Sequence, residues 1–535
     1  MERHEAGLTR LISHMRQCVL CGLSLTVLRT VWAIPFTNLT WQLARHARID
    51  GHLLVVDVPP EKAREGGYGR TRVDVSAFSG NCFIAEIVAQ GTGISKPAQP
   101  GSGLKFTVRY KDEESGLEHW PNTCSRIGDF PPQTISVAVQ HACRHGWVDI
   151  TLGLRDSSGK VVFDLSTLAI DSQDAFHPLT NQDYRVTYPA RVKGLPRLRG
   201  VMLPGSRCRE EDFRTLHGWG ATLARYQMTR HFDKIGANRD LADYDRWLDG
   251  KLDHLEREVL PWAKKYGIKI VVDLHAPPGG RDPDKDWTMY YDAKYADHFV
   301  ACWRRIATRF KGRPEIYGFD LVNEPKQTRR AVCDYWTIQK RAAEAVREID
   351  RETTIIIESN GWDSADTFSY LSPLAMDNVI YEVHMYQPLA FTHQGVHMDG
   401  NGPKFAYPDG KRGWNIDYIR RRLAPVRAFE RKHGAKIYVG EFSAVAWAEG
   451  AGQYIADCIA VFEEYGWDWT YHAFRDWNDW SVEHEVDGRR GKFRRSEDNP
   501  RRRALLDGFR RTVASDGEDA LEGVSTESRI KEGRR

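Results

Sequence analysis

Short apolar segments of strand length recur eight times between residues 198 and 471, and amphipathic stretches separate most of them. The eight segments are 198–203, 221–226, 268–274, 316–322, 354–358, 379–383, 436–440 and 468–471. The stretches 244–266, 293–310 and 332–350 have the apolar spacing of helices. Eight strands that alternate with helices are typical of a closed parallel barrel. The sequence therefore predicts an α/β fold whose main body is a (β/α)8 TIM barrel over residues 192–500.

Residues 51–176 show a different rhythm, in which period-two strands are separated by clusters of Gly, Pro and Ser. Strands are expected at 52–58, 71–78, 82–89, 105–110, 134–140, 147–154 and 161–165. Short strands at this spacing, without helices between them, predict an all-β sandwich. We expect it to be an accessory domain that precedes the barrel, joined to it by a linker near 171–191.

The two ends of the chain differ from both domains. In the N-terminal segment 1–50, an apolar run at 18–28 suggests a signal or anchor stretch over about 16–33. We therefore expect a secreted or periplasmic protein, with an amphipathic helix in a cytoplasmic protein as the alternative. No other segment approaches the ~20 apolar residues of a transmembrane helix, so stable membrane insertion of the mature chain is not expected. Residues 501–535 are expected to form a helix, 501–513, and then a disordered charged tail.

Charge and cysteine content exclude several kinds of partner. Lys plus Arg total 76 and Asp plus Glu 73, and this net charge of +3 gives no reason to expect nucleic acid. The nine cysteines are scattered without paired zinc-type spacing, and no predicted strand has the His-x-His or clustered carboxylates that would hold a metal ion. Neither a metal site nor a cofactor is expected. Cys82, Cys124 and Cys143 fall in the sandwich region, where one disulfide is possible but not predicted.

Polar residues finish most of the predicted barrel strands. They are Arg225, His275, Asn323 with Glu324, His384 with Tyr386, and Glu441. The carboxyl ends of barrel strands meet at one face, so these side chains are expected to converge on one pocket. Capping of a strand end is the simpler explanation for Asn323 and Glu324 taken alone. Two carboxylates among cations, a phenol and an amide favour a catalytic site.

Four of these strand ends lie in extended motifs. They read Val-Val-Asp-Leu-His-Ala-Pro-Pro-Gly-Gly (271–280), Leu-Val-Asn-Glu-Pro (321–325), Tyr-Glu-Val-His-Met-Tyr (381–386) and Tyr-Val-Gly-Glu-Phe (438–442). With them the chain resembles glycoside hydrolase family 5, the cellulase-like retaining β-glycosidases of clan A, over roughly 198–480. The resemblance implies that Glu324 is the proton donor and acid/base and that Glu441 is the nucleophile. Retaining glycosidases divide the reaction between two such carboxyl groups about 5 Å apart.

The resemblance also implies supporting roles for the other strand-end residues. Asn323 is expected to hydrogen-bond the sugar 2-hydroxyl, with loop capping as the alternative. Arg225 and Tyr386 are expected to keep the nucleophile ionised and oriented, although Arg225 alone could be a structural ion pair. His275 and His384 are expected to be subsite histidines.

The eighth strand departs from the family pattern, which commonly places a Trp beneath the sugar. His472 stands near that position, and Trp477 is the expected substitute platform just beyond the strand. In the sandwich, Trp120 and Trp147 are further candidate sugar platforms. Packing in a core or loop explains each of them more simply, so a structural accessory role is expected.

The expected activity is cleavage of β-glucosidic bonds in a polysaccharide or oligosaccharide. An endo-β-1,4-glucanase is the first hypothesis, and an exo-β-1,3-glucanase follows because 273–280 resembles that branch. A β-mannanase is the third. A polysaccharide-binding barrel without catalysis and a glycosyl-transferring enzyme are the alternatives of another class. The long loop 387–413 after strand six is expected to wall off one end of a cleft.

Overall fold

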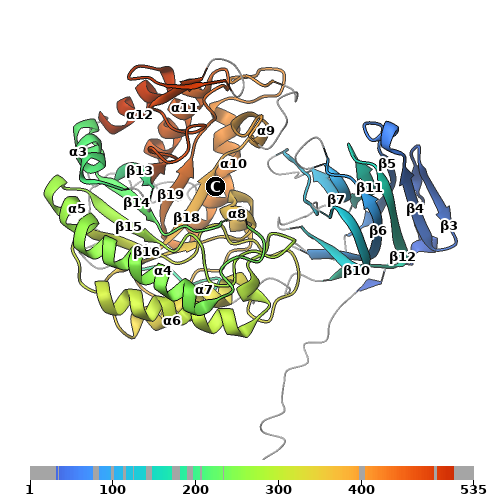
Figure 1. Ribbon diagram of the computed structural model, residues 1–535, viewed down its shortest axis with the longest axis horizontal. Coiled ribbons are helices and arrows are strands. Elements are labelled where there is room, and N and C mark those ends of the chain that lie inside the picture. Colours follow the sequence, from blue (N-terminus) through green and yellow to red (C-terminus); the bar gives the residue numbers. More distant parts are fainter. Residues whose placement is uncertain are drawn as a thin grey trace, which may run out of the picture.

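The computed structural model describes residues 32–33, 35–75, 83–97, 102–111, 116–123, 126–139, 147–171, 181–188, 197–204, 208–232, 234–396, 404–486 and 491–510. Within them a β-sandwich lies beside a closed barrel, which confirms the predicted fold class (Figure 1). Most of the signal-like stretch 16–33 lies outside the described residues, as do Cys82, Cys124 and Cys143. No helix of the described part is long and apolar enough to cross a membrane.

The sandwich consists of two antiparallel sheets around a core of Val, Leu, Ile and Phe. One sheet contains β10 (Gly128–Val139), β6 (Phe83–Ile94), β12 (Gly159–Asp171), β4 (Leu53–Val58), β3 (Ala47–Asp50) and β1 (Trp32–Ala33). The other contains β2 (Gln42–Leu43), β5 (Gly67–Asp74), β11 (Trp147–Arg155), β7 (Gly103–Lys111), β8 (Glu118–His119) and β9 (Asn122–Thr123). Strands β1, β2 and β3 precede residue 51, where the domain was expected to begin. Their two to four residues are too few to show a period in the sequence.

The barrel closes through eight parallel strands, and β20 pairs with β13. They are β13 (Arg199–Leu203), β14 (Leu223–Gln227), β15 (Lys269–Asp273), β16 (Ile316–Asp320), β17 (Thr354–Glu358), β18 (Val379–Met385), β19 (Lys436–Phe442) and β20 (Asp468–Tyr471). Nearly every strand residue is buried, because helices cover the outside and side chains fill the inside. This explains why the segments appear as almost continuous apolar runs in the sequence.

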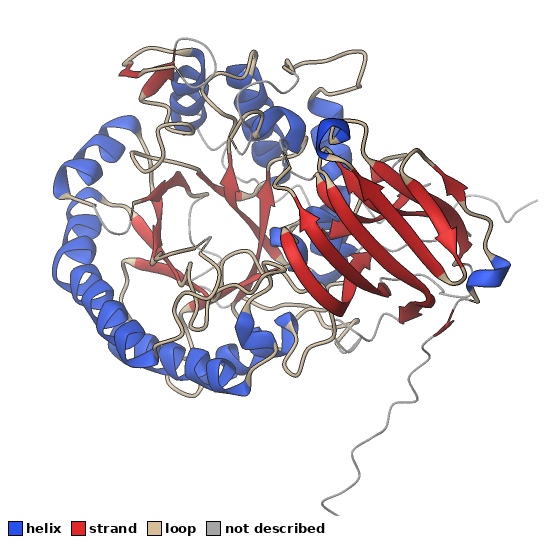
Figure 2. Cartoon of the chain, turned by 45° about the vertical axis from the view of Figure 1, so that its right-hand side comes forward, coloured by secondary structure: helices blue, strands red, loops and turns tan. Residues whose placement is uncertain are grey.

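Helices surround the barrel strands (Figure 2). The longer ones are α3 (Glu210–Trp219), α4 (Leu241–His254), α5 (Leu260–Tyr266), α6 (Ala293–Phe310), α7 (Tyr335–Arg347), α10 (Ile416–His433) and α11 (Ala451–Tyr465). A π-helical turn, Leu255–Val259, joins α4 to α5, so the expected helix 244–266 is one interrupted helical segment. Short helices α8 (Asn360–Asp363), η6 (Ala365–Ser369) and α9 (Leu389–Thr392) lie in the loops after β17 and β18.

The last described helix, α12 (Pro500–Arg510), packs on the barrel. The Phe509 ring stacks on Trp469 of β20 with centroids 5.3 Å apart, and Leu505 is buried beside them. The expected tail 501–535 therefore begins with a helix that belongs to the barrel's outer layer. This contact is difficult to predict from the sequence, because α12 is rich in charged residues and only one side of it is apolar and buried.

Among the residues that the structure describes, two ion pairs connect the sandwich to the barrel. His119 Nδ1 of β8 lies 3.3 Å from Asp366 Oδ2 of η6. Arg126 Nη2 lies 2.9 Å from Asp284 in the loop after β15. Ile84 and Ala138 of the sandwich also pack into the barrel's core cluster. The sandwich is thus held by loops at the C-terminal ends of the barrel strands, the face on which the predicted site lies.

Candidate active site

The predicted strand-end residues lie together at the C-terminal ends of β14 to β19. Arg225 is on β14, His384 and Glu441 are on β18 and β19, and the others directly follow their strands. The side chains of His275, His384 and Glu441 are nearly buried, and those of Arg225 and Asn323 are fully buried. Arg225 is the third residue of a five-residue strand rather than its end, and its long side chain reaches the site from below.

Glu324 and Glu441 face each other across this site. One carboxylate oxygen of each lies within 4.8 Å of the other and of His384 Nδ1. Glu441 accepts hydrogen bonds from Arg225 Nη1 at Oε1 and from Tyr386 Oη at Oε2, both at 2.8 Å. Glu324 Oε1 lies 3.1 Å from His384 Nδ1. Each carboxyl group therefore has its own fixed partner while the two stay close together.

Charges around the site shift the pKa of Glu441 and that of His384 in opposite directions. Burial alone would raise the pKa of Glu441, yet the positive charges of His384 and Arg225 hold that pKa well below its ordinary value. Burial would likewise lower the pKa of His384, but Glu441, Glu324 and Glu382 raise it well above its ordinary value. Glu441 is thus ionised, and His384 carries a proton on both ring nitrogens.

A layer of buried acids lies beneath the site, and the sequence reasoning missed it. Arg225 Nη2 donates to Asp320 at 2.6 Å and to Glu358 at 2.9 Å, and it lies 3.4 Å from Glu382. All three acids are fully buried. Burial is the main cause that raises the pKa of Asp320 to about 6 and the pKa values of Glu358 and Glu382 well above the ordinary range. One guanidinium therefore contacts several acids, and burial favours the neutral form of each of them.

The backbone at Glu324 is fixed in an unusual conformation. Its φ is 48°, in the left-handed region that costs a residue with a side chain roughly 1–2 kcal/mol. The Glu324 amide donates to Glu358 Oε2 at 2.6 Å, and its carbonyl accepts from Arg281 Nη2 at 3.2 Å. The Arg281 guanidinium lies over the Trp287 and Trp362 rings, 3.6 and 4.3 Å from their centroids. These contacts hold Glu324 at the position where its carboxyl group meets His384.

Asn323 presents a hydrogen-bond donor to the site. Its Oδ1 accepts from Arg225 Nη2 at 3.0 Å, which orients the amide. Its Nδ2 is buried and has no hydrogen-bond partner among the residues that the structure describes. A buried donor without a partner is costly, so such a group in a site indicates that a ligand supplies the acceptor.

Comparison with known proteins decides the family. The family model described as cellulase (glycosyl hydrolase family 5) matches residues 191–478. The chain belongs to glycosyl hydrolase family 5. It is a glycosidase, as the motifs predicted, and polysaccharides are its class of substrate.

Curated relatives and solved structures are similar to about half of this chain or slightly more. Endoglucanase C of Acetivibrio thermocellus is 29% identical over 301 residues, which cover 49% of this chain and 83% of that protein. Cellodextrinase A of Ruminococcus flavefaciens is 26% identical over 266 residues, covering 48% and 76%. The structure of Thermotoga maritima Cel5A with cellobiose is 21% identical, with a TM-score of 0.45, and covers 60% of this chain and 98% of that one.

His472, the residue that follows β20, lies among aromatic rings. His472 is 9% exposed, and its Nδ1 lies 3.0 Å from Tyr386 Oη. Trp477, the predicted substitute platform, is 52% exposed and lies beside His472, with ring centroids 6.4 Å apart. Trp480 is buried against His472 and Tyr386. The platform role of Trp477 stays a prediction.

His275, the remaining predicted residue, follows β15 and is nearly buried. Its Nδ1 is 2.8 Å from Asp273 Oδ2, and its ring lies against Phe232 with centroids 5.0 Å apart. The Asp273 carboxylate also lies 3.4 Å from Arg225. His275 is therefore oriented by the same acid layer that surrounds Arg225.

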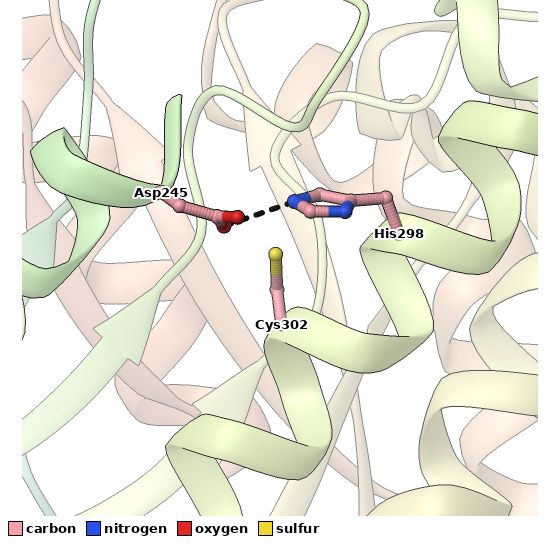
Figure 3. Close-up of side chains that lie close together, drawn as sticks. All are labelled: Asp245, His298 and Cys302. Carbon is pink, nitrogen blue, oxygen red and sulfur yellow. Dashed lines mark hydrogen bonds and ion pairs between the residues drawn. The ribbon is translucent and has the colours of Figure 1, made fainter. Parts of the chain in front are cut away.

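Three groups of described side chains contain residue types that can bind metal ions. Asp245, His298 and Cys302 on α4 and α6 place their polar atoms within 4.8 Å of one another (Figure 3). Asp245 Oδ1 already pairs with His298 Nε2 at 2.9 Å and with Arg305 Nη2 at 2.8 Å. These contacts explain the cluster as an ion-pair network between two outer helices. The other groups contain His384, whose ring nitrogens are committed to Glu324 and Glu382.

Proposed function

We propose that the chain cleaves β-1,4-glucosidic bonds of a glucan by double displacement, with retention of configuration. Glu441 acts as the nucleophile and Glu324 as the acid/base. The observation that carries this proposal is the distance of at most 4.8 Å between an oxygen of Glu324 and one of Glu441. Retaining glycosidases keep their carboxyl groups about 5 Å apart, whereas inverting enzymes leave roughly 6.5–9.5 Å for a water molecule.

In the first step a carboxylate oxygen of Glu441 attacks the anomeric carbon. The bond from that carbon to the leaving oxygen breaks, and Glu324 gives its proton to the leaving oxygen. The product is a glycosyl ester on Glu441. In the second step Glu324, now ionised, takes a proton from water, and the resulting hydroxide oxygen displaces Glu441 from the sugar. Two inversions restore the original configuration.

The environment of each carboxyl group suits its role. The hydrogen bonds from Arg225 and Tyr386 keep Glu441 ionised before attack and stabilise it again as a leaving group. The protonated Nδ1 of His384 donates a hydrogen bond to Glu324 Oε1. This leaves Oε2 of Glu324 to carry the proton that is delivered to the substrate. Asn323 Nδ2 is the donor available for the sugar 2-hydroxyl, a contact that strengthens in the transition state.

The names of the relatives support a β-1,4-glucan as substrate, because they are an endoglucanase and a cellodextrinase. One relative, a probable glucan 1,3-beta-glucosidase A of Aspergillus fumigatus, is 24% identical over 151 residues and covers only 26% of this chain. An exo-β-1,3-glucanase is therefore the second candidate. His472, which contacts Tyr386 and Trp480, stands near the position where the family commonly has a tryptophan. This supports a central subsite that differs from the usual one for either candidate.

A product profile tests this function. Purified protein is incubated with β-1,4-glucan, β-1,3-glucan, mannan and xyloglucan, and products are separated by size while proton NMR follows the first anomer formed. We expect oligosaccharides from β-1,4-glucan with the β-anomer appearing first. Single glucose units released from β-1,3-glucan would favour the second candidate. Absence of turnover on all four polymers would contradict a hydrolase and favour a binding barrel.

We also propose that the protein is exported and acts without a nucleic-acid partner. The apolar run 18–28 supports export, and the near balance of acidic and basic residues supports the second statement. Fractionation of expressing cells, with N-terminal sequencing of the mature protein, tests export. Recovery of the full-length chain from the cytoplasm alone would contradict it.

A further inference from the structure

The outer face of one sandwich sheet has a regular arrangement of exposed side chains. Residues of β5 alternate strictly between buried and exposed, and those of β11 do so over most of its length. Asp149 of β11 lies between two arginines, at 2.8 Å from Arg72 on β5 and at 3.4 Å from Arg109 on β7. Strands β5, β11 and β7 are neighbours in one sheet (Figure 1). The ion pairs therefore form one row across three strands on the solvent side of the sheet.

Two tryptophans border this row and remain open to solvent. Trp120, which follows β8, is 52% exposed, and the Arg109 guanidinium lies 4.9 Å from its ring centroid. Trp147, two positions before Asp149 on β11, is 56% exposed. Residues two apart on a strand share a face, so Trp147 projects from the same side as Asp149. Strand spacing and rise place the two tryptophan Cα atoms roughly 12 Å apart.

The same edge of the sheet is tied to the catalytic side of the barrel. His119, adjacent to Trp120, faces the opposite way, is buried, and pairs with Asp366 after β17. Arg126 pairs with Asp284 after β15. Both barrel residues lie in loops at the C-terminal ends of strands, where the active site is. These ion pairs hold the sheet that carries Trp120 and Trp147 next to the loops of the active-site face.

We propose that this face, formed by Trp120, Trp147, Arg72, Arg109 and Asp149, binds a neutral polysaccharide chain. Flat apolar rings match the apolar faces of sugar rings, and the paired charges offer donors and acceptors for hydroxyl groups without attracting ions. Two large aromatic side chains at half exposure on one face are unusual for a surface without a ligand. The choice of a β-1,4-glucan as ligand rests on the proposed function of the barrel.

The test compares the full-length protein with its W120A/W147A double variant on insoluble β-1,4-glucan. The control is Y68A, which removes a 39% exposed aromatic ring from the far end of the same outer face, opposite Gly153. We expect the partition constant to fall roughly threefold to tenfold for each tryptophan removed and to be unchanged in Y68A. Hydrolysis of a short soluble aryl cellobioside, and the melting temperature, should be the same in all three proteins.

The outcomes separate this proposal from the proposed function. Equal binding of wild type and W120A/W147A, or wild type that hydrolyses glucan without binding it in the insoluble form, would overturn the binding face and leave the hydrolase standing. Loss of binding in W120A/W147A without turnover by any protein would overturn the hydrolase and leave the face. A sedimentation change from dimer to monomer in W120A/W147A, with glucan binding unaltered, would show that a second copy covers the face and would also overturn the proposal.

Discussion

Arg225 Nη1 donates a hydrogen bond to Glu441 Oε1 at 2.8 Å, while Nη2 of the same guanidinium donates to Asp320 and Glu358. One buried cation thus joins the proposed nucleophile to the acid layer beneath it. Removing it leaves these carboxyl groups without their common partner. The stability of the barrel and the ionisation of Glu441 are therefore linked through one side chain.

Replacing Arg225 should be far more damaging than replacing an arginine on the outer helices. R225M is expected to lower the free energy of unfolding by about 3–5 kcal/mol, because it strands buried carboxylates. In the fraction of R225M that folds, the acid limb of the kcat/KM profile should move to higher pH. The reason is that the positive charge of Arg225, which lowers the pKa of Glu441, is no longer present. The control R305M removes a partly exposed pair with Asp245 and should cost about 1 kcal/mol or less. Equal costs in urea unfolding would contradict this account.

Replacing Glu324, the proposed acid/base, should slow hydrolysis to an extent that depends on the leaving group. E324Q is expected to lower kcat roughly 10²–10⁴-fold on cellulose oligomers, whose leaving group needs a proton. An aryl glycoside with an acidic phenol leaves without that help, so its first step should persist and the glycosyl-enzyme should accumulate. A burst of phenol in stopped-flow measurements reports this. A loss of the same size on both substrates would show that Glu324 acts in another way.

The free donor on Asn323 predicts a contact with the 2-hydroxyl. N323A is expected to lower kcat roughly 10–100-fold with little change in KM, because the hydrogen bond strengthens in the transition state. On a matched 2-deoxy glycoside the wild type should be slow already, and N323A should add little. The double-mutant cycle between residue and hydroxyl measures the coupling. Additive losses would place Asn323 in a purely structural role.

The acid layer predicts how stability depends on pH. Burial raises the pKa of Asp320 to about 6 and that of Asp363 to about 8, above their values in the unfolded chain. Such groups stabilise the fold fully below the unfolded pKa, and this contribution is lost as pH rises through the folded pKa. The free energy of unfolding should therefore fall between pH 5 and pH 8, by up to about 1.4 kcal/mol per pH unit for each group.

A neutral replacement of Asp363 tests this explanation. D363N keeps an oxygen that can accept from the Ser359 amide and hydroxyl, and it should flatten the upper part of the pH dependence. D243N, which changes an exposed carboxylate on α4, should leave the curve unchanged between pH 5 and pH 8. Chemical unfolding at several pH values supplies the measurement. A D363N curve parallel to the wild-type curve would exclude Asp363 as a cause.

The sequence predicted the fold and the rim of the site, because both depend on local patterns. Eight apolar runs gave the barrel, and strand ends gave Glu324 and Glu441. The acid layer was missed since Asp320 and Glu382 each stand between apolar neighbours, while Glu358 ends a strand whose end was not compared with the others. The sequence did contain a pattern that points to Glu382: it precedes His384 by two residues and Tyr386 by four, so the three side chains are expected on the same side of β18 and its extension.

Other features depend on contacts between distant parts of the chain. Arg225 and Glu441 are 216 residues apart, and only barrel closure brings them together. The same holds for α12, whose Phe509 finds its partner Trp469 on β20. Strand periodicity cannot show which of several buried acids surround one guanidinium, because that depends on side-chain length and rotamer across the barrel.

Covalent labelling of Glu441 tests the central claim most directly. The protein is incubated with an activated 2-deoxy-2-fluoro-β-cellobioside, digested, and analysed by mass spectrometry beside E441Q. We expect one added fluorocellobiosyl group on the peptide that contains Glu441, and none in E441Q. A label on Glu324 instead, or cellulose hydrolysis with inversion and no label, would contradict a double displacement through Glu441.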